Sequence, residues 1–491
     1  MKKIIVIILV IFAGLTSCDD IITEKPVDFL VPGSFPANEQ DAVAATTAAY
    51  TRLHSSIISF YYGFTPSDIA FQGQHNMRPV SWFLDLNPNN GDATAMWQQN
   101  FQGIALANTV IQFVPDVEMN DKALQQRLIA EAKFLRAFYY FELVRVYGDV
   151  PIINEVVINT EDLIGITRNT VEEVYTLIEQ DLTEALAVLP NDYVGEDLGR
   201  ATKWSATALL AKVHLTQGEW EAAATRAHQV IASGMFGLVA DYNSLWSQNA
   251  EYVPMPDKNG NLVNEIVFDI QFEQNERNDF KQSWTASRDT EIVGATNAVG
   301  GGWENMLPTT DYLAMFEAGD LRKDISYVTE LNGNILESPR TPGAGPISGK
   351  YLNADGDPPK SNNGSQNTYV IRYSDVLLMR AEAENELNGP AAAYQFINLV
   401  RDRAGLSPLA GLNQESFRQA IRKERATELG FEGHRKFDLL RWGIFVETIR
   451  NVNDSHMETP AANIQEHHVL LPVPAREREI SEGSLTQNPG Y

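Results

Sequence analysis

The chain has 491 residues, of which 44% are hydrophobic, 10% aromatic and 21% charged. This length and apolar content suffice for a large buried core, in one large domain or two to three ordinary ones, and they argue against a disordered chain. The formal net charge of −26 repels phosphate backbones and no basic stripe interrupts it, so we expect no nucleic-acid partner. The single cysteine, Cys18, excludes a disulfide within one chain.

The first residues have the layout of a secretion signal. Lys2 and Lys3 precede an apolar run at residues 4–15, which is too short to span a bilayer well. Leu15-Thr16-Ser17-Cys18 then resembles a bacterial lipobox, so residues 1–17 are predicted to be a signal peptide and Cys18 the lipid-bearing N-terminus. The alternative is an ordinary secreted protein with one unpaired thiol. Residues 18–40 are predicted to form a lipidated tether and connecting loop, and no later segment is apolar enough to span a membrane.

Apolar residues at steps of three and four predict a series of helices. They cover residues 41–56, 97–113, 122–147, 170–189, 202–233 and 375–404. The blocks 202–233 and 375–404 each contain two helices around a glycine turn, with small residues that favour close antiparallel packing, as in tetratricopeptide units.

Two regions lack this periodicity. Residues 57–95 are rich in aromatic and turn-forming residues, and residues 235–370 are rich in Asn, Gly, Asp and Pro. Within the second region, residues 266–270 are a strand candidate. The predicted fold is therefore mainly α, a tetratricopeptide-like helical-pair scaffold with a large irregular loop-rich insertion carrying a few short strands.

The stretch at residues 420–443 carries alternating charges, A-I-R-K-E-R-A-T-E-L-G-F-E-G-H-R-K-F-D-L-L-R-W-G. Opposite charges three positions apart predict pairs on one helical face. The predicted pairs are Arg425/Glu428, Glu432/Arg435 and Asp438/Arg441. Either Glu428 and Glu432 divide acid and base roles in catalysis, or the stretch forms a buried ion network that fixes helix docking. The second interpretation is favoured, because every carboxylate has an arginine within reach.

The segment from Glu424 to Gly443, E-R-x-x-E-L-x-F-E-G-x-R-x-x-D-L-x-R-W-G, resembles the most recognisable motif of the SusD/RagB family. Further family segments resemble residues 135–151, residues 308–322 and the tail at 470–491. The resemblance therefore covers the whole chain in the expected order. It implies a lipid-anchored outer-membrane protein, exposed at the cell surface, that captures an oligosaccharide for a SusC-like TonB-dependent transporter. Asp19 and Asp20 resemble surface-export signals.

The resemblance also implies the domain organisation. Residues 41–491 would form a single SusD-like domain, with a helical scaffold at 41–234 and 371–450. The loop-rich insertion at 235–370 would lie on the ligand side.

Candidate ligand-binding residues follow from the chemistry of sugars. A sugar presents apolar C–H faces ringed by hydroxyl groups, so its site needs flat aromatic side chains beside fixed polar groups. The candidates from the two loop-rich regions are Tyr62, Trp82, Trp284 and Trp303, with Asp68, Arg78 and Asn305. Ordinary local packing is an equal alternative for each of them.

Motifs for catalysis or metal binding were sought as well. No G-x-S-x-G, H-E-x-x-H or phosphate-loop motif occurs. Residues 353–357 begin like a calcium loop, but Gly364 stands where the final carboxylate is needed, which favours a solvated turn. We therefore predict no catalytic residue, no cofactor and no metal, in a protein that is not an enzyme. The alternatives are a peptide-binding member of the same family, a protein-only scaffold and a glycoside hydrolase.

Overall fold

The computed structural model describes residues 35–56, 61–73, 77–247, 253–272, 281–285, 304–331, 334–335, 346–351 and 366–491. The predicted signal peptide, Cys18, most of the tether, Trp303 and the calcium-loop-like segment lie outside these residues. Helices make up 59% of the structure and strands 6%, which confirms the predicted mainly α class with a few short strands. No helix in the described part of the chain has the length and apolar content to cross a membrane.

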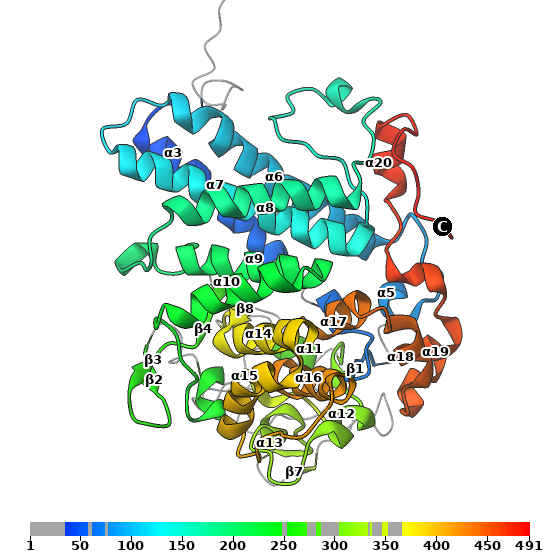
Figure 1. Ribbon diagram of the computed structural model, residues 1–491. Coiled ribbons are helices and arrows are strands. Elements are labelled where there is room, and N and C mark those ends of the chain that lie inside the picture. The colour runs from blue at the N-terminus through cyan, green and yellow to red at the C-terminus, as the bar shows by residue number, and fades with distance from the viewer. Residues whose placement is uncertain are drawn as a thin grey trace, which may run out of the picture.

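The N-terminal scaffold is built from long helices that pack on their neighbours in the chain (Figure 1). They are α3 (Glu39–Thr51), α6 (Gly91–Phe113), α7 (Lys122–Tyr147), α8 (Val171–Val188), α9 (Lys203–Gln217) and α10 (Trp220–Ala232). Helix α7 has the predicted bounds, because Asp121 caps its first turn and Gly148, at φ 71°, ends it. Helix α6 begins six residues earlier than predicted, since Asn90 accepts a hydrogen bond from the Ala93 amide and so caps it there.

The C-terminal half continues the same construction with shorter helices. They are α14 (Tyr373–Asn388), α15 (Pro390–Arg403), α16 (Gln414–Leu429), α17 (Arg435–Arg441), α18 (Phe445–Asn451), α19 (Glu458–Asn463) and α20 (Ala475–Ile480). Helix α14 packs on α10, so the two predicted helix pairs, α9–α10 and α14–α15, are joined into one stack. Small side chains at the contacts, such as Ala224, Ala227 and Ala383, are buried and let the helices lie close together.

Short elements fill the described part of the loop-rich regions. They are α5 (Pro79–Trp82), α11 (Lys281–Thr285), α12 (Thr310–Met315) and α13 (Lys323–Ser326), with β1 (Ala70–Phe71), β2 (Met255–Pro256), β3 (Leu262–Val263), β4 (Ile266–Ile270), β5 (Leu307–Pro308), β6 (Glu330–Leu331), β7 (Asn334–Ile335) and β8 (Thr368–Arg372). The predicted strand at 266–270 is β4, which pairs antiparallel with β8. Phe268 of β4 packs edge-to-face on Phe134 of α7, with ring centroids 4.9 Å apart, so this ribbon belongs to the main core.

Candidate functional site

The two loop-rich regions predicted from the sequence meet through a short β-ladder. Strand β1 pairs antiparallel with β5, with Ala70 opposite Pro308 and Phe71 opposite Leu307. The ladder is continued by the Gly73 amide, which donates to the Glu304 carbonyl at 2.7 Å. Residues more than 230 positions apart in the chain are therefore held side by side, and polar side chains at the end of this ladder converge.

Gln72 is the residue on which these polar groups converge. Its amide nitrogen donates to Oδ1 of Asn305 at 3.3 Å, and its amide oxygen accepts from the backbone N–H of Arg78 at 2.9 Å. The Asn305 backbone N–H in turn donates to the Trp284 carbonyl at 2.9 Å. Gln72 and Asn305 are both buried, so these bonds lie in a poorly hydrated place and hold the three segments in one arrangement.

An aromatic layer lies against this polar group. Tyr61 packs edge-to-face on Trp284, with ring centroids 5.4 Å apart, and its hydroxyl is bonded to the Ser81 hydroxyl at 2.9 Å. The Arg78 guanidinium lies 5.5 Å from the centre of the Tyr61 ring and is ion-paired with Asp92 at 2.6 Å. Burial raises the pKa of Tyr61 to about 12, so its hydroxyl remains a neutral donor and acceptor near pH 7.

The structure thus brings together three of the predicted ligand residues, Arg78, Trp284 and Asn305. Trp82 belongs to the same region through α5, next to Ser81. Among the described residues, Nε of Arg78 and the indole N–H groups of Trp82 and Trp284 have no hydrogen-bond partner. Trp82 and Trp284 are mostly buried, whereas the Arg78 side chain is 28% exposed and follows the exposed Met77 in the chain.

Two predicted residues lie apart from this cluster. Tyr62 is buried, and its ring lies 3.4 Å below the ammonium group of Lys436. Asp68 accepts two hydrogen bonds from Arg435, at 2.7 and 2.5 Å, and lines a separate groove of about 530 Å³ beside α12 and α18. Both therefore serve contacts within the protein here, and Trp303 lies outside the described residues. Their role in ligand binding stays a prediction.

Sequence reasoning missed Gln72, Tyr61 and Asp92. All three lie in the aromatic, turn-rich region at residues 57–95. Gln72 has no sequence signal as a bridge, because its partner Asn305 is 233 positions away and is reached only through the β1–β5 ladder.

The charged stretch at 420–443 forms the predicted buried ion network. Glu428 is fully buried and is bonded by Arg322 and Arg372, each at 3.1 Å, and by Arg403. Burial alone would raise its pKa, but these guanidinium groups hold it well below its usual range. The interpretation of this stretch as a structural network is thereby supported, since a carboxylate held ionised in this way is poorly suited to donate a proton.

Its neighbour Glu432 has the same surroundings. It accepts from Arg372 and Lys350, both at 2.7 Å, and the balance of burial and these charges lowers its pKa too. The two carboxylates therefore do not have the separated pKa values that mark an acid–base pair.

Two of the three ion pairs predicted in this stretch are wrong. Asp438 and Arg441 do pair, at 2.9 Å, but Arg425 bonds Asp375 and Asp438 rather than Glu428. Arg435 bonds Asp68 rather than Glu432. Helix α16 ends at Leu429 and Phe431 has φ 66°, so Glu432 and Arg435 do not share one helical face. Arg425 and Glu428 both lie on α16, but each is buried and pairs with charged groups on other elements instead.

Comparison with known proteins supplies the family. The family description "SusD family" matches residues 326–491, and "Starch-binding associating with outer membrane", also a SusD-like family, matches residues 61–215. Together the two matches cover more than half of the chain. The chain belongs to the SusD/RagB family. The second match contains Tyr61, Gln72 and Arg78, and the first contains Glu428 with its partners Arg372 and Arg403.

Individual SusD-like proteins are similar over nearly the whole chain. "SusD-like protein P25" of Formosa agariphila is 28% identical, across 100% of this chain and 99% of its own length. A crystal structure of a SusD homolog from Bacteroides thetaiotaomicron is 26% identical, with a TM-score of 0.78, covering 93% of this chain and 98% of the homolog. A laminarin-binding SusD-like protein is 27% identical, with a TM-score of 0.74, covering 93% of this chain and 100% of that one.

Proposed function

We propose that this protein is a cell-surface lipoprotein that binds an oligosaccharide and passes it to a SusC-like TonB-dependent transporter in the outer membrane. The observation that carries the binding role is the convergence of Arg78, Trp284 and Asn305 around Gln72 and Tyr61. Membership of the SusD/RagB family, and the similarity to a laminarin-binding SusD-like protein, support a carbohydrate as the ligand.

The chemistry of this cluster suits a sugar. Hydroxyl groups of a sugar accept hydrogen bonds, and the partly exposed guanidinium group of Arg78 is a donor for them. The apolar face of a pyranose packs on aromatic or aliphatic side chains, and the exposed Met77, which precedes Arg78 in the chain, offers such a surface. Trp303, two positions before Asn305 in the sequence, is proposed as a further stacking surface.

Isothermal titration of the purified full chain against panels of glycans and peptides tests the proposal. We expect saturable binding to one glycan without turnover, weakened about tenfold or more by Arg78→Met or Trp303→Ala, since each removes a contact worth at least about 1.4 kcal/mol. Val157→Arg is the matched control, because Val157 lines a separate apolar hollow of about 470 Å³ between α6 and α20. Binding lost in Val157→Arg and kept in Arg78→Met would place the site in that hollow.

The ion network supports a non-catalytic role. The only carboxylate pair singled out as an acid–base candidate, Glu428 and Glu432, is buried and held ionised by basic groups. A glycosidase needs one carboxyl group whose pKa is raised. Product analysis after long incubation with the bound glycan is expected to find no cleavage. Cleavage that is abolished by a single Glu→Gln substitution would instead establish a hydrolase.

Anchoring and partnership need separate tests. Cys18→Ala is expected to release the protein from the membrane fraction, because two or three acyl chains at about 0.8 kcal/mol per buried methylene would provide the attachment. The transporter is expected to co-purify with the wild-type chain from outer membranes. Binding to peptides alone would keep the fold and change the substrate, and co-purification without any small-ligand binding would favour a protein-only scaffold.

A further inference from the structure

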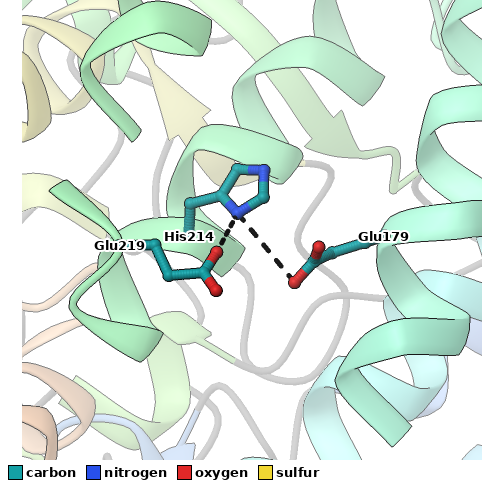
Figure 2. A group of neighbouring side chains, drawn as sticks. All are labelled: Glu179, His214 and Glu219. Carbon is teal, nitrogen blue, oxygen red and sulfur yellow. Dashed lines mark hydrogen bonds and ion pairs between the residues drawn. The ribbon is translucent and has the colours of Figure 1, made fainter. Parts of the chain in front are cut away.

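Three side chains in the N-terminal scaffold converge on one point, far in sequence from the proposed glycan site (Figure 2). His214, in the last turn of α9, directs Nδ1 toward Glu219 at 2.6 Å and toward Glu179 of α8 at 3.9 Å. One ligand atom from each residue lies within 4.8 Å of the other two. His214 is buried, while the two carboxylates are partly open to solvent.

The backbone explains why these residues meet. Gly218 adopts φ 75° after α9 and turns the chain sharply into α10, so the Glu219 amide donates to the His214 carbonyl at 2.9 Å. Glu219 is then the N-cap residue of α10, with no capping bond from its own side chain, and its carboxylate is directed at the imidazole. Gln217 donates to Oε1 of Glu179 at 2.7 Å, the same oxygen that lies 3.9 Å from His214 Nδ1, and so helps to fix that carboxylate.

The charge at this point is not balanced by basic groups. In the described part of the chain, neither Glu179 nor Glu219 forms an ion pair with a lysine or arginine; their only ion-pair contact is His214. Elsewhere in the scaffold comparable carboxylates do have such partners. Glu184, for example, has a similar exposure and pairs with Lys133. Two carboxylates and one imidazole without a lysine or arginine partner therefore form a compact acidic group, which favours a divalent cation.

We propose that Glu179, His214 and Glu219 bind a divalent transition metal ion of the zinc class. In a tetrahedral zinc site with bonds of about 2.0–2.2 Å, neighbouring ligand atoms lie roughly 3.3 Å apart. This spacing is between the 2.6 Å from His214 Nδ1 to Glu219 and the 3.9 Å from His214 Nδ1 to Glu179. A shift of well under 1 Å in each of the two partly exposed glutamate side chains would bring both distances to this spacing. A histidine nitrogen among the ligands favours zinc over calcium and magnesium, which prefer oxygen ligands alone.

Such an ion would link α8 to the α9–α10 turn. These elements are packed neighbours in the helical stack, and α10 in turn carries α14 (Figure 1). An ion that binds only the folded state raises the free energy of unfolding as its concentration rises. The ion would therefore stabilise the scaffold without entering the glycan site. The three ligands leave a fourth tetrahedral position for water. The Gln217 amide would orient Glu179 in the outer shell. The proposal departs from the sequence-based expectation of no metal, because Glu179 is 35 positions away from His214 and no spacing motif links them.

Calorimetric titration of the chelator-treated full chain with ZnCl2, and separately with CaCl2, tests the proposal. Every protein carries Cys18→Ser, so that the one thiol does not bind zinc. We expect one zinc equivalent, a raised melting temperature and no calcium response. In Glu179→Gln/Glu219→Gln, which keeps the side-chain shapes, the zinc Kd should rise by at least about tenfold and the thermal shift should disappear.

His228→Gln is the matched control, because His228 is an exposed imidazole on the adjacent helix α10. It should bind zinc as the Cys18→Ser parent does. Circular dichroism establishes that each variant is folded, and Co2+ substituted at the site should give the visible absorption of a tetrahedral ion. The proposal is overturned if the parent shows no saturable zinc binding, if the double variant binds equally well, or if calcium binds in place of zinc.

Discussion

Arg435 donates two hydrogen bonds to the carboxylate of Asp68, across 367 positions of the chain. Arg435 lies in the family motif on α17, and Asp68 lies in the loop that leads to β1 and Gln72. The same arginine also donates to the Arg422 carbonyl at 2.8 Å. The motif therefore does more than dock helices, because this pair holds the loop on which the proposed glycan site is built.

Substitution Arg435→Lys is expected to lower the free energy of unfolding by about 1–2 kcal/mol. Lysine keeps the charge but cannot make the paired bonds to Asp68 together with the bond to the Arg422 carbonyl. Urea unfolding monitored by fluorescence measures the change. Arg450→Lys is the control, because Arg450 pairs with Glu466 at the surface, where the pair should contribute less than about 1 kcal/mol. Equal effects of the two substitutions would contradict the argument.

Substitution Gln72→Leu is expected to weaken glycan binding about tenfold while the protein remains folded. It removes the bridge between Asn305 and the Arg78 backbone, so the binding groups lose their fixed arrangement. Calorimetry with the glycan identified in the panel measures the affinity. Gln419→Leu, an exposed substitution on α16, should bind as the wild type does. Unchanged affinity in Gln72→Leu would show that this cluster does not position the ligand.

The sequence was sufficient to predict most of the long helices and one strand, and insufficient to predict their long-range partners. Periodicity predicted α7 and β4 at their observed bounds, since both depend on local pattern and on terminating residues. The choice of Arg78, Trp284 and Asn305 rested on loop composition, and the β1–β5 ladder brings their segments together. The pairing of Arg425 with Asp375 depends on how α14 and α16 pack, which local spacing does not encode.

Stability between pH 7 and pH 5 should depend on His434. Burial, together with the nearby Lys212 ammonium, lowers the pKa of His434 to about 3, whereas the unfolded chain has an ordinary value near 6.5. Between these two values the unfolded state binds a proton that the folded state does not, so stability falls as the pH falls. Lowering the pH from 7 to 5 should therefore reduce the free energy of unfolding by about 2 kcal/mol.

Substitution His434→Gln keeps an acceptor for Lys212 and removes the titrating group. The loss of unfolding free energy between pH 7 and pH 5 should then be smaller than in the wild type by about 2 kcal/mol. Denaturant unfolding at the two pH values gives the difference directly. His228→Gln, at an exposed position, should leave the wild-type pH dependence intact. A His434→Gln protein with the wild-type slope would mean that other groups cause the loss.

Lys436 is expected to destabilise the fold at neutral pH. It is fully buried, and Nζ has no hydrogen-bond partner among the described residues. The rings of Tyr62, Phe83 and Phe445 surround it, with the Tyr62 centroid 3.4 Å away. Cation–π contacts contribute about 0.5–2 kcal/mol, but removing an ammonium group from water costs several kcal/mol. Burial therefore lowers the pKa of Lys436 well below its ordinary range.

Substitution Lys436→Met retains an unbranched side chain among the same rings, and should raise the unfolding free energy at pH 7 by about 1–3 kcal/mol. Because the folded-state pKa of the lysine is below the unfolded value, wild-type stability rises as the pH rises toward about 10. The advantage of Lys436→Met should therefore shrink between pH 7 and pH 10, which denaturant unfolding at both values measures. Lys423→Met, at an exposed position on α16, should change stability by less than about 0.5 kcal/mol. A Lys436→Met protein that is less stable at both pH values would show that the aromatic contacts outweigh the desolvation of the amine.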